Sequence, residues 1–173
     1  MRKIVSVIVI LIGVCLLIGC EGGREADYFG YREKDFRAEV RGEREGVAFD
    51  ATVRVHRLAD GTREVQVLYL APEAAKGMTV SGLMKADCGL ESLHVSLQGM
   101  AVPVEQAEIE GLLAPLTSLM KGEEISTVQK IGTRYRLTFS DGGEMVLAER
   151  EGGLFPERFS SEELYFTVVW VEG

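Results

Sequence analysis

Residues 47–69, VAFDATVRVHRLADGTREVQVLY, show the pattern on which the rest of the fold prediction is built. Apolar side chains occupy alternate positions on both sides of a central Ala59-Asp60-Gly61-Thr62. This alternation indicates half-buried strands, and the Asp-Gly pair supplies the positive φ that a tight hairpin turn needs. The stretch therefore predicts two antiparallel strands joined by a short turn.

The same two-residue period extends in both directions along the chain. Phe36, Ala38 and Val40 alternate with charged residues before a charged turn predicted at residues 42–46. Further strand patterns are Met78–Met84, Leu93–Leu97, Ile125–Val128, Tyr135–Phe139, Met145–Leu147 and Tyr165–Val171. The last of these is almost continuously apolar, which predicts a strand covered on both faces. Leu154–Phe159, which follows two glycines, is predicted to be a loop.

One segment in the middle of the chain has a helical period. Glu105 and Glu108 suit a helix N-terminus, and an apolar stripe follows at helical spacing. The stripe consists of Ile109, Leu112, Leu113, Leu116, Leu119 and Met120. Pro115 lies inside it, and an interior proline removes a backbone hydrogen bond at a cost of roughly 3 kcal/mol. We therefore predict a kink or break, giving two short helical pieces that end near Gly122.

This order of elements predicts a fold of the α+β class. Antiparallel strands are followed by one broken helix and then by more antiparallel strands. A single helical segment covers little of a large flat sheet, so a strongly curved sheet is the economical solution. We expect a half-barrel of antiparallel strands with one kinked helical segment on its concave face.

The N-terminus carries a targeting signal. Arg2 and Lys3 precede an uninterrupted apolar run, Ile4–Gly19, which is the pattern of a secretory signal. The run ends in Leu17-Ile18-Gly19-Cys20, which resembles the lipobox of bacterial lipoproteins. In that family the cysteine thiol takes a diacylglyceryl group and a peptidase cuts before it. An uncleaved anchor helix is the alternative, because roughly 20 apolar residues span a bilayer.

The lipobox resemblance implies a division of the chain. Residues 1–19 would be the signal peptide, residues 20–35 the lipidated Cys20 with its tether, and residues 36–173 a single domain. Two acyl chains hold a protein firmly at a membrane where one is marginal. We therefore expect the domain to be lipid-anchored on the extracytoplasmic face of a bacterial membrane.

The net negative charge argues against anionic binding partners. Without Arg2 and Lys3 the chain keeps 17 of its 19 basic residues against 27 acidic ones, a net charge of −10. Nucleic acid and anionic headgroups repel such a domain, so we expect neither as a partner. Attachment to the membrane must then come from the lipid on Cys20 and not from a basic patch.

The chain offers few groups for catalysis or for metal binding. His56 and His94 are its histidines, and Cys88 is the cysteine left once Cys15 is removed and Cys20 is lipidated. A catalytic thiol needs a nearby base, whereas Asp87-Cys88-Gly89 indicates a turn. The glutamate pairs at 123–124 and 162–163 are typical of solvated loops. We expect no catalytic residue, metal or cofactor, and an enzyme is the weakest of three functional hypotheses.

Lipobox, strand meander, mid-chain helix and returning hairpins together resemble the lipoprotein-carrier superfamily of the Lol type. Its members are curved half-barrels capped by helices, and several carry or transfer lipids or lipoproteins in the cavity. Some similar lipoproteins of spore-forming bacteria bind cell-wall enzymes instead. The resemblance covers most of residues 36–171 and rests on the order of elements, so no site residues are carried over. The family usually begins with a substantial helix, for which Arg24–Lys34 leaves little room.

Two further hypotheses follow for the function. The first is a binding module for a lipid or a lipoprotein acyl chain, although the same side chains would also suit a plain core. Its candidate lining residues are Met78, Met84, Leu112, Leu116, Leu119 and Met120. The second is an envelope scaffold that docks a cell-wall or spore-germination enzyme through a sheet edge or through Phe155 and Phe159. A carrier predicts a bound lipid, whereas a scaffold predicts a packed interior.

Overall fold

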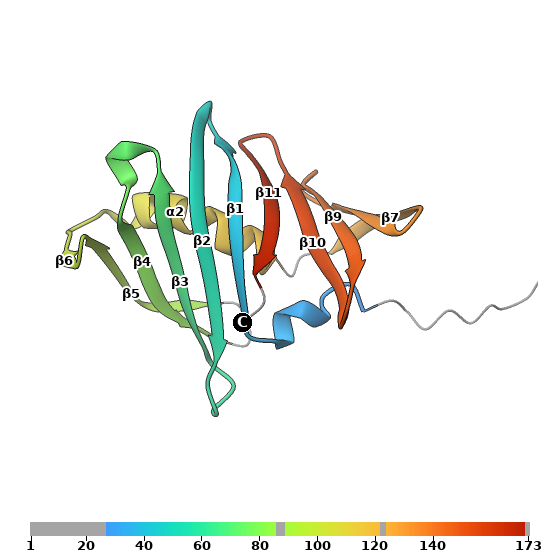
Figure 1. The fold of residues 1–173 in the computed structure, drawn as a ribbon, viewed down its shortest axis with the longest axis horizontal. Coiled ribbons are helices and arrows are strands. Elements are labelled where there is room, and N and C mark those ends of the chain that lie inside the picture. The colour runs from blue at the N-terminus through green and yellow to red at the C-terminus, as the bar shows by residue number, and fades with distance from the viewer. Residues whose placement is uncertain (1–26, 86–88, 122–123, 172–173) are drawn as a thin grey trace, which may run out of the picture.

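The computed structural model describes residues 27–85, 89–121 and 124–171. Figure 1 shows their arrangement, with one large sheet and a helix across one face. The strands are β1 (Phe36–Arg44), β2 (Val47–Arg57), β3 (Arg63–Ala71), β4 (Met78–Met84), β5 (Leu90–Leu97), β6 (Met100–Ala101), β7 (Ile125–Ile131), β8 (Arg134–Phe139), β9 (Glu144–Arg150), β10 (Gly153–Ser160) and β11 (Leu164–Val171). The helical segments are the 3-10 turns η1 (Gly30–Glu33) and η2 (Glu73–Ala75) and the helix α2 (Gln106–Leu119).

The described strands form one open antiparallel sheet. Its order is β6-β5-β4-β3-β2-β1-β11-β10-β9-β8-β7, so the first and last strands pair at the centre. The register of that pair runs from Arg37 opposite Val171 to Arg44 opposite Leu164. Since α2 follows β6 and precedes β7, the chain passes from one edge of the sheet to the other through the helix (Figure 1). The predicted α+β class with a mainly antiparallel sheet and one helical segment is confirmed.

The hairpin formed by β2 and β3 has the expected turn. Strands β2 and β3 pair from Asp50 opposite Ala71 to Arg57 opposite Arg63. Gly61 has a φ of 87°, and the carboxylate of Asp60 accepts a hydrogen bond from the backbone N–H of Thr62 at 2.9 Å. The positive φ and the side-chain bond are what an Asp-Gly turn provides.

The core lies between the sheet and α2, on what we call the inner face. Alternate residues of the strands point to it, as the two-residue period requires. Its buried strand residues include Ala38, Val40, Phe49, Ala51, Val53, Val55, Val65, Val67, Val80, Val95, Leu137, Met145, Leu147 and Phe166. From the helix, Leu113, Leu116 and Leu119 are buried against β3, β4 and β10.

The predicted break in the helix is wrong, because α2 is a single helix that contains Pro115. Its first turn has the reciprocal capping box of Glu105 and Glu108. Burial of one apolar face supplies most helical stability in proteins, and it offsets the bond that Pro115 cannot make. In the same turn Thr117 Oγ1 donates to the carbonyl of Ala114 at 3.2 Å.

The charged turn predicted at residues 42–46 is shorter than expected. Strand β1 continues through Arg44, and the turn proper is Glu45-Gly46, with φ values of 49° and 81°. At Gly42 a Cβ atom would come within 2.0 Å of the Tyr165 carbonyl oxygen. Gly42 therefore lets β1 and β11 approach closely, and it belongs to the strand.

The predicted loop at Leu154–Phe159 is also wrong, because these residues belong to β10. A proline is tolerated in a strand where no ladder bond is required of it. Strand β10 pairs with β11 only from Arg158 onward, and its register with β9 shifts between Pro156 and Arg158. The carbonyl of Pro156 instead accepts a hydrogen bond from the indole Nε1 of Trp170.

Strand β11 is covered on one face and not on two, contrary to prediction. Phe166 and Val168 are buried, whereas Tyr165 is 44% exposed and Val169 is 58% exposed. The physical reason is that α2 lies on the inner face, and no second layer among the described residues covers the other. We call that other side the outer face.

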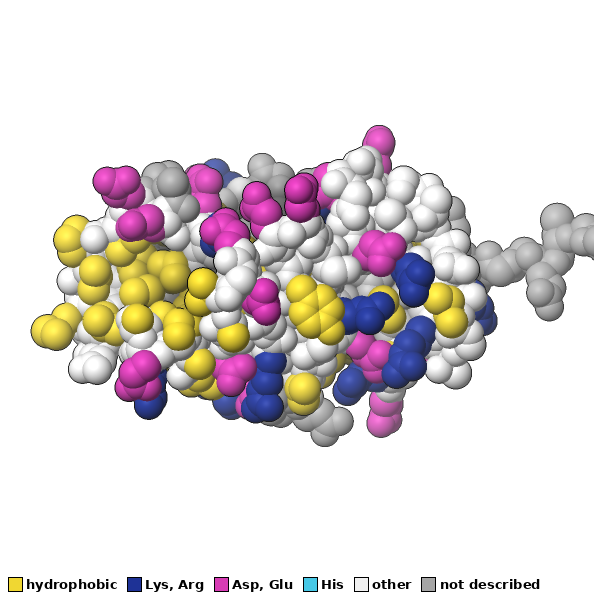
Figure 2. All heavy atoms as spheres, turned by 90° about the horizontal axis from the view of Figure 1, so that it is seen from above, with side chains coloured by type: hydrophobic (Ala, Val, Ile, Leu, Met, Phe, Trp, Pro, Cys, Tyr) yellow, Lys and Arg dark blue, Asp and Glu magenta, His cyan; other side chains and the backbone are white. Residues whose placement is uncertain are grey.

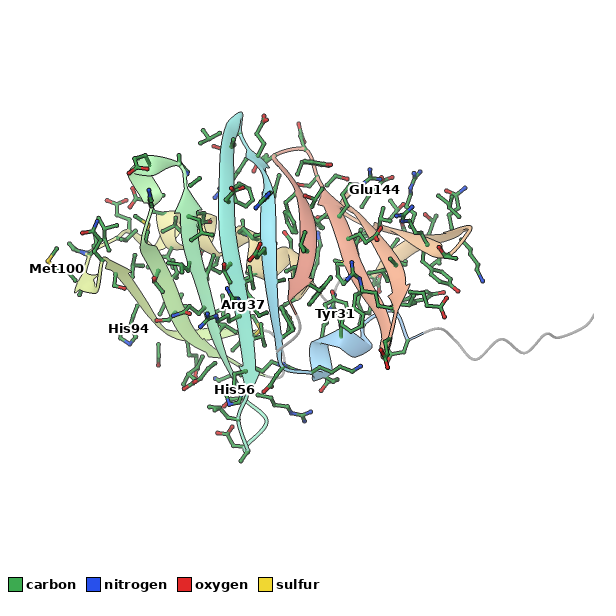
Figure 3. The ribbon with its side chains drawn as sticks, viewed as in Figure 1. Tyr31, Arg37, His56, His94, Met100 and Glu144 are labelled. Carbon is green, nitrogen blue, oxygen red and sulfur yellow. The ribbon has the colours of Figure 1, made fainter. Side chains whose placement is uncertain are left out.

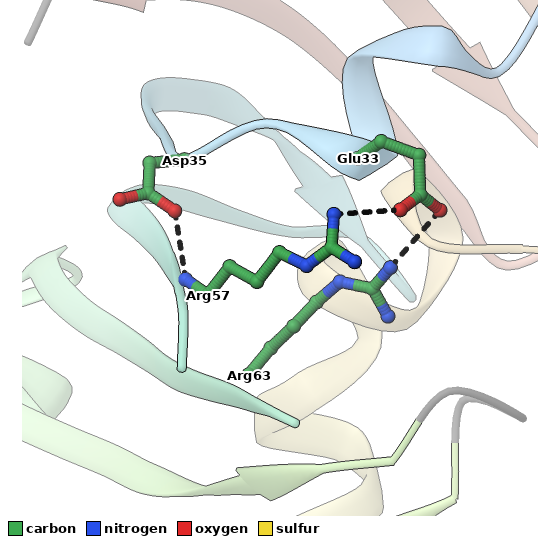
Figure 4. A network of polar contacts seen from close by, with 4 residues as sticks. All are labelled: Glu33, Asp35, Arg57 and Arg63. Carbon is green, nitrogen blue, oxygen red and sulfur yellow. Dashed lines mark hydrogen bonds and ion pairs between the residues drawn. The ribbon is translucent and has the colours of Figure 1, made fainter. Parts of the chain in front are cut away.

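The segment before β1 is held against the sheet by the 3-10 turn η1. Tyr31 is buried and donates its hydroxyl hydrogen to the carbonyl of Leu119. Figure 4 shows the polar network beside it, in which Glu33 accepts from Arg57 Nη1 at 3.3 Å and from Arg63 Nη2 at 3.2 Å. Asp35 accepts from the backbone N–H of Arg57 at 2.7 Å. We call this network the η1 clamp.

Candidate functional site

An apolar groove opens on the inner face, at the end of the sheet away from the η1 clamp. It lies between α2 and the ends of β2, β3 and β4 that adjoin η2, and its volume is about 600 Å³. Its apolar wall includes Val47, Phe49, Tyr69, Pro72, Met78, Val104, Leu112, Pro115 and Leu164. Figure 2 shows apolar side chains gathered in a hollow at this end, with acidic side chains around its margin.

The six predicted lining residues are divided between the groove and the core. Met78 and Leu112 line the groove and are half-buried. Met84, Leu116, Leu119 and Met120 are at most 1% exposed and belong to the core. The helical stripe was therefore assigned to the correct face, but only one position of it reaches the groove wall.

Tyr69 ties the helix to the sheet beneath the groove. It is 7% exposed, and its hydroxyl donates to the carbonyl of Leu112 at 2.9 Å. Burial raises the pKa of Tyr69 to about 12, because a phenolate loses its hydration there, while the positive charge of Arg44 opposes that rise. Its ring packs beside Phe49, with centroids 6.2 Å apart. Tyr69 therefore helps to hold α2 at the distance from β3 that keeps the groove open.

Three charged side chains lie at the mouth of the groove. Arg44, Glu45 and Glu108 are part of its lining, and the Arg44 guanidinium is 3.7 Å from the Glu45 carboxylate. Gly111 makes room for this guanidinium, since a Cβ atom there would be 2.2 Å from Arg44 Nη1. The site thus combines an apolar wall with one cation and two carboxylates at its entrance.

A second, polar hollow of about 580 Å³ lies on the outer face and contains both histidines. Strand register places Arg54, Gln66, Ser81 and His94 in one row across β2 to β5. Figure 3 shows His94 on the β5 side and His56 near the β2–β3 turn. His56 Nδ1 is 2.6 Å from the Asp35 carboxylate. Both histidines are exposed.

Nothing in the described part of the chain assembles a metal centre. Within residues 27–85, 89–121 and 124–171, side chains of histidine, cysteine, aspartate and glutamate do not gather in threes at a spacing that would hold an ion. Cys20 with its proposed lipid, and Cys88, lie outside the described residues.

The two phenylalanines predicted to contact a partner are largely covered by other side chains. Phe159 is 3% exposed and stacks on Phe166, with ring centroids 5.4 Å apart. Phe155 is half-buried in an aromatic cluster with Tyr31 and Trp170. These rings leave little surface that a partner could contact.

Comparison of the chain with known protein families, with curated proteins and with solved structures finds no match in any of the three. Among the described helices, none is both long enough and apolar enough to cross a bilayer.

Sequence reasoning missed the residues that shape the groove most directly. Arg44 did carry a signal, because it continues the inward series Ala38, Val40 and Gly42 at a position where an apolar residue is expected. Tyr69 was recognised only as a strand residue, and no local pattern indicates its contact with α2.

Proposed function

We propose that this protein is a lipid-anchored extracytoplasmic lipoprotein whose inner-face groove binds the acyl chain of a lipid or lipoprotein. The proposal includes a sheet that curves around α2 as a Lol-type half-barrel, so that the sheet and helix enclose the ligand between them. The groove between α2 and the ends of β2–β4 is the observation that carries it.

Size and chemistry of the groove support an apolar ligand. Small-molecule sites typically have volumes of roughly 300–1,000 Å³ and apolar walls with few polar groups, and this groove has about 600 Å³. Met78 on its wall is a flexible and polarizable side chain, which suits a ligand of variable shape. An acyl chain fits such a surface better than a polar metabolite does.

The position of the groove also suits an anchored protein. Residue 27, the first described, precedes η1 at one end of the sheet, whereas Arg44 and the groove lie at the other end. Strand β1 spans this distance with nine residues, a length of about 30 Å. A lipid on Cys20 would therefore hold the η1 end near the membrane and leave the groove accessible from the opposite side.

Native mass spectrometry with organic extraction tests the proposal, using residues 21–173 purified without lipidation. We expect a co-purifying lipid at up to one copy per chain, or saturable binding of a fluorescent fatty acid. Met78→Glu places a charge in the groove and should abolish binding. Met100→Glu is the matched control, since Met100 is 69% exposed on β6 and lies outside the groove lining. A clean apo mass with no binding of added lipid would refute the proposal.

A second candidate function, the docking scaffold, is favoured by one observation at the β7 edge. This strand pairs only with β8 among the described strands, and Val128 and Ile131 on it are 43% and 46% exposed. An unprotected edge of this kind can add a strand from a partner. A photo-crosslinker at Val128 should then capture one envelope protein in cells, whereas the same crosslinker at exposed Leu70 on β3 should not. Equal labelling at both positions would exclude docking at this edge.

A further inference from the structure

We infer that the groove selects its lipid by a zwitterionic head group, with a phosphate on Arg44 and an ammonium group beside Glu45 and Glu108. The inference rests on the proposed binding of an acyl chain and adds the chemical class of the ligand. The three charged side chains at the mouth of the groove are the observation behind it.

Arg44 occupies a position that a simple core would give to an apolar residue. It lies on the inner side of β1, in the same alternating series as the buried Ala38 and Val40. Instead of facing solvent on the outer face, its guanidinium lies against Gly111 of α2, in space that any side chain at position 111 would fill. The glycine thus forms a notch that keeps a positive charge at the entrance of an apolar groove.

The guanidinium keeps hydrogen-bonding capacity for a ligand. Its contact with Glu45, at 3.7 Å, is longer than a hydrogen bond, and its side chain remains 38% exposed. A guanidinium has five N–H donors in a planar fork, which matches the oxygen pairs of a phosphate group. A phosphate ester joined to an acyl chain would place its phosphate on Arg44 and its acyl chain in the apolar groove at the same time.

The two carboxylates argue against a purely anionic head group. Glu45 is held beside Arg44 by the tight turn at the end of β1, and its side chain is 62% exposed. Glu108 precedes Gly111 by three residues, so both lie on one side of α2. One cation flanked by two carboxylates repels an extra negative charge but accommodates a phosphate together with an ammonium group. The net charge of −10, counted without Arg2 and Lys3, also repels an anionic head group.

Competition binding with three palmitoyl lipids tests this inference. The lipids share one acyl chain and carry different heads: lysophosphatidylethanolamine is zwitterionic, lysophosphatidylglycerol is anionic, and monopalmitoylglycerol is uncharged. Each lipid is titrated, below its critical micelle concentration, against a fluorescent fatty acid bound to residues 21–173. We expect the zwitterionic lipid to bind roughly five- to tenfold more tightly than the other two, the effect of one or two charge-assisted contacts at a partly exposed site.

Variants assign this preference to individual groups. Arg44→Gln should lower the affinity for the zwitterionic lipid to that for monopalmitoylglycerol. Gly111→Ala should do the same by displacing the guanidinium, and alanine favours the helix, so loss of folding would not explain the result. Glu108→Gln, which retains a side-chain oxygen for the capping box, should narrow the gap between zwitterionic and anionic lipids. Arg41→Gln is the control, because Arg41 is 71% exposed and pairs with Asp50 across the outer face.

The outcomes separate the two proposals. If none of the lipids displaces the probe, acyl-chain binding fails and the head-group inference fails with it. If all three lipids bind equally to the wild type and to Arg44→Gln, the groove binds acyl chains without contacting the head group. Only the head-group inference is then overturned. Tightest binding of the anionic lipid would also overturn it.

Discussion

Tyr69→Phe is the substitution that tests the buried contact between α2 and β3 most directly. It removes only the hydroxyl that donates to the Leu112 carbonyl at 2.9 Å, and it leaves the ring packed beside Phe49. A buried hydrogen bond of this kind stabilises by about 1 kcal/mol. At pH 7 we therefore expect the variant to unfold with a free energy about 1 kcal/mol below that of the wild type.

At high pH the same substitution should instead make the protein more stable than the wild type. Burial raises the pKa of Tyr69 from 10.0 to about 12 in the folded protein, so between these values the folded state holds a proton that the unfolded state has released. Ionisation of the unfolded chain then costs the wild type about 1.4 kcal/mol of stability per pH unit. Phenylalanine cannot ionise. The two stability curves should therefore cross a little below about pH 11, above which the variant is the more stable protein.

Urea unfolding from pH 7 to pH 11.5 measures both effects, with the fluorescence of the single tryptophan, Trp170, as the signal. Other groups that titrate in this range affect both proteins and cancel in the difference between them. Tyr165→Phe is the control, because Tyr165 is 44% exposed on the outer face. Curves for Tyr69→Phe and wild type that stay parallel across the range would refute the desolvated environment of Tyr69 and, with it, the close seating of α2.

Three other predictions concern the η1 clamp, the core and the anchor. The hydrogen bond from the backbone N–H of Arg57, and then that with His56, lower the pKa of Asp35 from 3.8. The ionised Asp35 carboxylate therefore stabilises the fold above pH 3.8, and this contribution is lost as the pH falls through the lowered pKa. Asp35→Asn should unfold at a lower urea concentration than the wild type at pH 6 and should lose less stability between pH 5 and pH 2. Equal loss of stability in acid by both proteins would contradict the η1 clamp. Leu116→Ala, at a 0% exposed core position, should cost about 2–5 kcal/mol, whereas Leu112→Ala in the groove wall should cost less in urea unfolding; the reverse order would place Leu112 in the core. Cys20→Ala should release the protein from the membrane fraction of expressing cells, and continued retention after signal cleavage would disprove the lipid anchor.

Local sequence patterns are sufficient for most of the strands and for the Asp60-Gly61 turn. The alternation of Phe49, Ala51, Val53 and Val55 makes one side of β2 apolar, which places it in a sheet with that side inward. Asp60-Gly61 determines the adjoining hairpin because few other dipeptides adopt its backbone angles at low cost. These features depend on neighbours within a few residues, so they can be recognised without any knowledge of the fold.

Features that depend on distant contacts could not be recognised in this way. Pro115 indicates a break when α2 is considered alone, but burial of Leu113 and Leu116 against the sheet keeps the helix continuous. Pro156 and the glycines before it indicate a loop, yet pairing with β9 makes the segment a strand. In both cases tertiary packing outweighs a local preference worth only a few kcal/mol.

An antiparallel sheet with one helical segment follows from the amino-acid sequence, because the periods of 2 and 3.6 residues are properties of the backbone. The pairing of β1 with β11 at the centre of the sheet, and the crossing of α2 between its edges, depend on contacts between distant segments and are visible only in the folded protein. The tertiary structure also separates the apolar stripe of the helix into core residues and groove residues. Leu112 and Leu116 are equivalent in the sequence pattern, but packing against the sheet buries Leu116 completely and leaves Leu112 on the wall of the groove. Arg44 and Gly111 lie far apart in the chain, and the packing of α2 on the inner face of the sheet brings them together at that groove.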